Sequence, residues 1–365
     1  LALPAGARPR PKLVWQTTSA LSRSSFGRVQ RTCWQVALPH VDGAVALTAE
    51  IGQELHDFGY RGPVWTIPNA RRVDRFVDLD RDREARALRA EIGVVSEVPV
   101  IGLVGYLVRE KQPALAVEVL AAVRAEGVPA HLVVAGAGPL EPEVVDAVAR
   151  TGLGEHVSLL GHREEAERVL GGIARLVLTS DFEGVPGILV EAAMAGCPVV
   201  TFPVGAVSAV VVDGETGVIT AGSTVSAMAS EVVALLADPG RRRALSDAAR
   251  VHGGHFAMEV VADRYEAHLT ELVSSSPEPE PRVDERRSPG CDQRQNRWLP
   301  CRGARRRGTR VAEATASEAP GTGDRPRPKV LHITTSDSSL DLLLRPQLVA
   351  FQEAGYDVVT ASAPG

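Results

Sequence analysis

The stretch VPVIGLVGYLVREKQPALAVEVLAAVRAEGVPAHLVVAGAGPL, residues 98–140, indicates how this chain of 365 residues folds. An apolar run from Val98 to Val104 is followed by Gly105 and by an Ala-, Val- and Leu-rich helical pattern over 113–126. A second apolar run then covers 131–135. Apolar strands that alternate with amphipathic helices are typical of a parallel sheet covered on both faces. We therefore predict an α/β fold.

The same strand–helix unit continues to residue 273. Further strands are expected at 157–160, 176–179 and 198–202, helices are expected to begin near 141, 164 and 187, and closing helices are expected near 223–237, 239–252 and 256–273. An alternation of this length predicts one complete doubly wound, Rossmann-like domain over residues 98–273.

The segment before this domain, residues 1–97, is expected to be incomplete. It has candidate strands at 12–16, 44–48 and 64–67 and one candidate helix at 50–58. Because three short strands with so few helices cannot close a domain, we interpret it as the last third of a second α/β domain, followed by an interdomain link.

Two segments follow the complete domain. Residues 274–325 contain only three residues of the Ile, Leu, Val, Phe and Met group, but eleven arginines and six prolines. This composition cannot bury enough apolar surface to offset the chain entropy, so it predicts a disordered linker. Residues 326–365 are expected to form the first β-α-β of another α/β domain, with strands at 329–336 and 356–365 and a helix at 339–355.

Composition limits the classes of function. The net charge of −5 argues against a nucleic-acid binder, and no apolar run is long enough for a membrane-spanning helix. Four cysteines without metal-ligand spacing favour a reducing, cytoplasmic location, and the histidine spacing indicates no metal site. Peripheral association with the inner face of a membrane stays open. Only three of the 40 basic residues are lysines, so the position of Lys111 is informative.

The strongest local signal is SDFEGVPGILVEAAMAGCPVV, residues 180–200. Glu183 and Glu191 flank a turn that leads into a helix; the turn residues are Gly184, Val185, Pro186 and Gly187. Backbone N–H groups at a helix start suit an anion such as phosphate. Glu183 can reach a ligand above the turn, and Glu191 could accept hydrogen bonds from a diol such as ribose. The alternative is that both are surface glutamates at a helix start.

Three further strand ends carry weaker signals. In the stretch GLVGYLVREKQP, residues 102–113, Arg109 and Lys111 follow Gly105. They are expected at the edge where open α/β sheets bind ligands, and two cations there suit a diphosphate. The turn AGAGPL at 135–140 lacks the third glycine of a dinucleotide-binding motif. The backbone of His162 and Arg163 could contact a base. Solvated loop charges and tight turns are the alternatives.

Taken in this order, the four signals resemble the family 4 (group 1) nucleotide-sugar-dependent glycosyltransferases, which have the GT-B fold. The similarity begins at IPNARRVDRF (67–76), like the Ile-Pro-Asn-Gly interdomain link of the family, and ends at FAMEVVADRYEAHLTEL (256–272). One departure is Tyr106, which stands where the family usually has Arg; Arg109 is the candidate substitute.

The resemblance implies a retaining transfer of a sugar from a nucleotide diphosphate sugar to a glycan, lipid or small-molecule acceptor, without an obligatory metal or other cofactor. Residues 98–273 would then bind the donor, and residues 1–97 would belong to the acceptor-side domain. By position, Glu183 would act on the donor sugar as the catalytic residue, Glu191 would bind the ribose and Lys111 the diphosphate. Backbone amides of residues 184–187 would assist.

Residues 326–365 resemble the beginning of such an enzyme, although they follow the complete domain. In the favoured explanation, the chain contains the end of one glycosyltransferase followed by the start of a second. In the other explanation, it is a permuted single enzyme whose last β-α-β docks beside the strands of residues 1–97. We expect nucleotide binding to survive in such a fragment and transfer to be weak or absent. A non-catalytic nucleotide-sugar-binding module and a sugar-nucleotide epimerase are the alternative functions.

Overall fold

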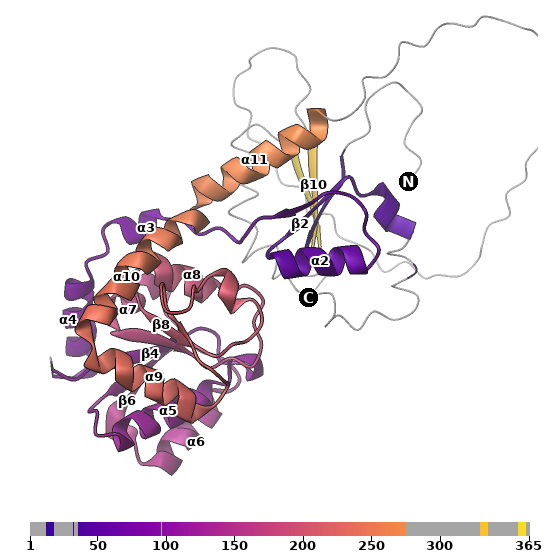
Figure 1. Cartoon of the computed structure of the whole chain (residues 1–365). Coiled ribbons are helices and arrows are strands. Elements are labelled where there is room, and N and C mark those ends of the chain that lie inside the picture. The colour runs from indigo at the N-terminus through magenta and orange to yellow at the C-terminus, as the bar shows by residue number, and fades with distance from the viewer. Residues whose placement is uncertain are drawn as a thin grey trace, which may run out of the picture.

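The computed structural model describes residues 12–17, 32, 36–95 and 97–274, and the backbone of residues 329–334 and 357–362. This part of the chain contains a six-stranded sheet and a smaller three-stranded sheet (Figure 1). Residues 275–328, which make up nearly all of the expected linker, and the helix expected at 339–355 lie outside the described residues.

Six parallel strands form the larger sheet, in the order β6-β5-β4-β7-β8-β9. They are β4 (Val100–Val104), β5 (His131–Ala135), β6 (Val157–Gly161), β7 (Arg175–Leu178), β8 (Val199–Thr201) and β9 (Val218–Ile219). This is a doubly wound order, in which the direction of progression reverses between β4 and β7. Strands β4, β5, β7 and β8 are buried along their whole length, as continuous apolar runs predict. The predicted α/β fold class is confirmed.

Helices cover both faces of this sheet (Figure 1). One apolar core lies under α5 (Pro113–Ala125), α6 (Glu141–Thr151) and α9 (Val225–Ala237). The other lies under α7 (Ala166–Gly172) and α8 (Gly187–Met194), against which α4 (Arg81–Ile92) and α10 (Pro239–Gly253) pack. Helix α4 thus belongs to the packing of the larger sheet, although it precedes residue 98.

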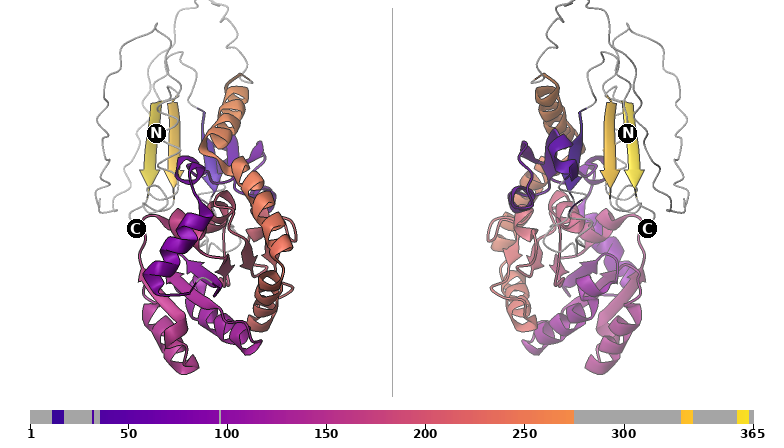
Figure 2. Two further views of the ribbon diagram at one scale, coloured as in Figure 1. Left: turned by 90° about the vertical axis from the view of Figure 1, so that its left-hand side faces the viewer. Right: turned by 90° about the vertical axis from the view of Figure 1, so that its right-hand side faces the viewer.

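The smaller sheet is parallel, with the order β1-β2-β3, and is linked to the larger one by α11 (Met258–Ser274) (Figures 1 and 2). Its elements are β1 (Val14–Thr17), β2 (Gly43–Ala46), α2 (Ala49–Asp57) and β3 (Val64–Thr66). Val261 and Tyr265 of α11 pack into a core with Ile67. Trp65 stacks on His268 at a ring distance of 5.1 Å. Helix α11, which follows the α10 helix of the larger domain in the chain, therefore packs against the smaller sheet.

The last two strands, β10 (Lys329–Thr334) and β11 (Asp357–Ser362), pair in parallel over all six residues (yellow in Figure 2). Both expected strands of residues 326–365 are thus present. Strand β10 lies next to β1, but no hydrogen-bonded ladder joins these two strands among the described residues.

One charged side chain is buried inside the larger domain without a carboxylate partner. Arg175 of β7 is 0% exposed, and its Nη1 donates to the carbonyl oxygen of Val232 at 2.7 Å. Its Nε and Nη2 atoms have no hydrogen-bond partner among the described residues. Burial, with a further contribution from the cation of Arg242, lowers the pKa of Arg175 to about 9. The fold therefore carries the cost of burying a charge.

Replacing Arg175 with methionine should stabilise the protein. Methionine keeps an unbranched apolar chain but removes the buried charge, and replacing buried charges by apolar residues typically adds about 1–4 kcal/mol to the free energy of unfolding. For a domain of this size that corresponds to an increase in Tm of roughly 2–4 °C per kcal/mol. Arg150→Met is the control, since Arg150 is exposed in its ion pair with Glu118. A lower Tm for Arg175→Met would show that Arg175 stabilises the fold.

Candidate functional site

The loops that follow β4 and β7 meet at the carboxyl edge of the larger sheet, because these two strands are neighbours. The first loop contains the short 3-10 helix η3 (Arg109–Lys111). Thr179 Oγ1 donates to the carbonyl oxygens of Lys111, at 3.0 Å, and Gln112, at 3.1 Å. The N–H of Asp181 donates to the carbonyl oxygen of Glu110 at 2.9 Å. These bonds fix the β4 loop on the end of β7.

The two loops bring Lys111 and Glu183 together. Lys111 Nζ donates to Glu183 Oε1, and Ser180 Oγ donates to the same oxygen at 2.6 Å. The side chain of Glu183 is only 8% exposed, whereas that of Lys111 is 25% exposed. A carboxylate this deeply buried needs an ion pair or hydrogen bonds, and Glu183 has both. The geometry therefore places a fixed carboxylate beside an accessible ammonium group.

Glycines let the surrounding backbones approach these loops. A methyl carbon built on Gly205 would lie 1.7 Å from the carbonyl oxygen of Glu183, and Gly205 has a left-handed φ of +53°. In the AGAG turn, a methyl carbon on Gly136 would lie 1.8 Å from the carbonyl oxygen of Gly105. These glycines are therefore required by close packing of the loops at the carboxyl edge of the sheet. From the sequence pattern alone, only a tight turn was expected at Gly136.

Helix α8 begins at Gly187, the last residue of the expected turn, with Pro186 as its N-cap. Glu191 lies one turn into the helix, with its side chain 25% exposed. Arg71, from the interdomain link (residues 67–76), donates from Nε to Glu191 Oε1 at 2.8 Å. Sequence reasoning missed Arg71, although two adjacent arginines inside the IPNARRVDRF motif were a visible signal.

Three expected site residues take no part in the contact between Lys111 and Glu183. Arg109 is exposed, with no side-chain partner among the described residues. His162 and Arg163 follow β6, and Arg163 pairs with Glu91 of α4. Both line a cavity of about 380 Å³ with residues of α4 and α7. The side chain of Arg163 is thus engaged by α4, whereas His162 is exposed, and the contact of their backbone with a base stays a prediction.

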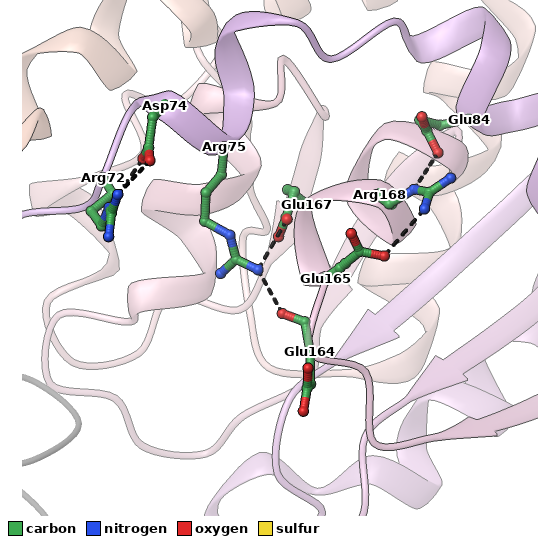
Figure 3. A network of polar contacts seen from close by, with 8 residues as sticks. All are labelled: Arg72, Asp74, Arg75, Glu84, Glu164, Glu165, Glu167 and Arg168. Atoms are coloured by element: carbon green, nitrogen blue, oxygen red, sulfur yellow. Dashed lines mark hydrogen bonds and ion pairs between the residues drawn. The ribbon is translucent and has the colours of Figure 1, made fainter.

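A polar network next to this cavity fixes the loop after β6 (Figure 3). Arg75 Nη2 donates to the carbonyl oxygen of Glu164 at 2.7 Å and pairs with Glu167 at 3.0 Å. Arg168 pairs with Glu84 of α4 at 3.0 Å. Because Arg75 belongs to the interdomain link, the link is anchored on the same loop that carries His162.

The described residues show neither a metal site nor a membrane-spanning helix. Within those residues, no three His, Cys, Asp or Glu side chains gather where they could hold a metal ion. Every helix in the described part of the chain is too short or too polar to cross a bilayer.

Comparison with known families agrees with this geometry. Residues 84–252 match the model of the family described as "Glycosyl transferases group 1". The match covers a little less than half of the chain. The matched region contains the loop of Lys111, the turn at Glu183 and helix α8. The resemblance inferred from the sequence motifs is therefore confirmed.

Two curated proteins are similar in sequence to parts of this chain. The chain is 31% identical over 252 residues to the D-inositol 3-phosphate glycosyltransferase of Geodermatophilus obscurus. The matched stretch covers 64% of this chain and 54% of that relative. It is 38% identical over 95 residues to the GDP-mannose-dependent alpha-(1-6)-phosphatidylinositol monomannoside mannosyltransferase of Mycolicibacterium smegmatis, or 26% of this chain and 24% of that relative. The chain thus spans about half the length of the first relative and a quarter of the second.

Solved structures show the same fold. The structure of HepE from Anabaena in complex with UDP matches with a TM-score of 0.65 and 18% identity, over 71% of this chain and 72% of that one. A glycosyltransferase from Rickettsia africae matches with a TM-score of 0.64 and 14% identity, over 72% of this chain and 71% of that one. At these identities the likeness concerns the fold alone, and it confirms the predicted GT-B type.

Proposed function

We propose that this chain binds a nucleotide diphosphate sugar on its six-stranded domain and that the site serves retaining sugar transfer to a glycan, lipid or small-molecule acceptor. The observation that carries the proposal is the arrangement of Lys111, Glu183 and Glu191 around the start of α8. Relatives whose names state glycosyl or mannosyl transfer, and a structural neighbour in complex with UDP, support it.

The proposed roles follow from charge and position. Lys111 and the N–H groups at the start of α8 supply positive charge to the diphosphate, which becomes a more negative leaving group as the bond to the sugar breaks. Glu183 accepts hydrogen bonds from the sugar hydroxyls, and Glu191 accepts them from the ribose. Since these groups offset the developing charge, the proposed reaction requires no metal ion.

Binding of nucleotides to the whole chain tests the proposal. Thermal unfolding is measured with UDP, GDP and ADP, each with and without EDTA, for the wild type and for Glu191→Ala. A nucleotide at 100 times its Kd should stabilise the protein by about 2.7 kcal/mol. We expect one nucleotide to raise the Tm, a smaller increase for Glu191→Ala, and no effect of EDTA.

Other outcomes would contradict parts of the proposal. No increase in Tm with any of the three nucleotides would contradict donor binding. Loss of the increase with EDTA would contradict metal independence. Incubation with the matching nucleotide sugar separates the reaction classes, because an epimerase would convert the donor without an acceptor. A binding module would leave the donor unchanged with every acceptor tested.

A further inference from the structure

Arg71 extends into the candidate site from a fixed backbone. Its N–H donates to the carbonyl oxygen of Phe256 at 2.8 Å, and its carbonyl oxygen accepts from the N–H of Met258 at 3.0 Å. These two bonds join the interdomain link to the start of α11. The Arg71 side chain therefore starts at the point where the two sheets are connected, and it points toward the larger one.

The guanidinium of Arg71 lies over the first turn of α8. Its Nε donates to Glu191, and its Nη1 donates to the carbonyl oxygen of Ala70 at 2.9 Å. A methyl carbon built on Gly187 would lie 1.7 Å from Nη2, so only the missing side chain of Gly187 leaves room for this group. Nη2 itself has no hydrogen-bond partner among the described residues.

A cation at the start of a helix is unfavourable unless an anion binds beside it. The start of a helix carries a partial positive charge of about half an elementary charge, which repels a guanidinium. In the structure, Glu191 offsets this repulsion. Lys111 is paired with Glu183, whereas Nη2 of Arg71 is a charged donor without a partner among the described residues and lies beside Gly187 at the start of α8. A planar guanidinium and backbone amides that face the same space are well suited to phosphate oxygens.

We infer that Arg71 binds the diphosphate of the nucleotide donor, together with the start of α8. The inference rests on the proposed function, which places the diphosphate at this helix end. Arg71 then acts as a second cation of the site, supplied by the interdomain link. Its bond to Glu191 holds the guanidinium in place before the nucleotide arrives.

The variant Arg71→Met tests this assignment in the whole chain. The probe is whichever of UDP, GDP and ADP binds the wild type best, compared with its monophosphate and its nucleoside by calorimetric titration. Loss of a charge-assisted hydrogen bond should weaken binding of the diphosphate by about tenfold or more. The monophosphate should lose less, and the nucleoside should bind with unchanged Kd.

Matched variants separate a contact with phosphate from a structural effect. Arg72→Met is the control, because Arg72 is the neighbouring arginine but is exposed and paired with Asp74. Arg71→Lys should recover part of the affinity for the diphosphate. Gly187→Ala alone should displace the Arg71 guanidinium and weaken binding of the diphosphate. Added to Arg71→Met, the same change should weaken that binding much less, because there is no guanidinium left to displace.

The outcomes distinguish this inference from the proposed function. If no nucleotide binds the wild type, the proposed function is wrong, and the role of Arg71 is wrong with it. If nucleotides bind and Arg71→Met weakens nucleoside and diphosphate equally, Arg71 only supports the fold of the link. Unchanged or tighter binding of the diphosphate by Arg71→Met would likewise overturn the inference while leaving the proposed function intact.

Discussion

Replacing Glu183 with glutamine should slow the release of nucleoside diphosphate from the matching nucleotide sugar by at least about 100-fold, the usual effect of removing one group that stabilises a transition state. Affinity for the free nucleoside diphosphate should be kept. Glutamine has nearly the same size as glutamate and can still accept the hydrogen bond from Ser180. The change therefore removes mainly the negative charge beside the donor sugar.

The expected affinity follows from the contact between Glu183 and Lys111. In the wild type, the ammonium group of Lys111 is shared between this carboxylate and any phosphate that binds. Without the charge on residue 183, Lys111 is free to bind the diphosphate alone, so the Kd should stay the same or decrease. Loss of turnover with unchanged or tighter binding is the combination that identifies Glu183 as a catalytic residue.

Turnover is measured as released nucleoside diphosphate, and affinity by calorimetric titration of the same preparation. Asp181→Asn is the matched control: this neighbouring carboxylate is exposed, and only its backbone N–H takes part in fixing the loop. Removing the charge of Asp181 should change neither the turnover of the donor nor the affinity for the nucleoside diphosphate. If Glu183→Gln turned over the donor at the wild-type rate, the catalytic role of Glu183 would be excluded. A parallel loss of nucleotide affinity would instead indicate that residue 183 organises the binding loop.

The sequence was sufficient to predict the sheet and the approximate position of the site. Four of its strands are largely apolar and are buried along their whole length, as is typical of strands covered on both faces. In a doubly wound sheet, the first and fourth strands are neighbours, so the residues after β4 and β7 must meet. The meeting of Lys111 and Glu183, 72 positions apart in the sequence, follows from that order.

Side-chain partners could not be predicted in the same way. Arg71 lies 120 positions from Glu191, and its contact depends on how the interdomain link crosses the start of α11. No local pattern encodes that crossing. Arg163 likewise pairs with Glu91, because α4 packs on α7 although it precedes the predicted domain. Sequence periodicity determines which face of an element is buried, but not which loop lies above its end.

Replacing Gly205 with alanine should be the most destabilising single change proposed for the site. The new methyl carbon would lie 1.7 Å from the carbonyl oxygen of Glu183 and 2.7 Å from its carbonyl carbon. A left-handed φ of +53° adds strain, because alanine in this region costs about 1–2 kcal/mol. Forcing atoms into a packed site typically costs a further 1–3 kcal/mol, so the total loss should be about 2–5 kcal/mol.

Gly214→Ala separates strain from steric conflict. Gly214 also has a left-handed φ, of +75°, but a methyl carbon there would have no neighbour within 4 Å. This control should lose only the 1–2 kcal/mol of strain, a decrease in Tm of roughly 2–8 °C at about 2–4 °C per kcal/mol. The larger decrease for Gly205→Ala should come with loss of donor turnover, because the backbone of Glu183 must move to admit the methyl group. Equal decreases for the two variants would show that the loop of Gly205 moves away freely and does not hold Glu183 in position.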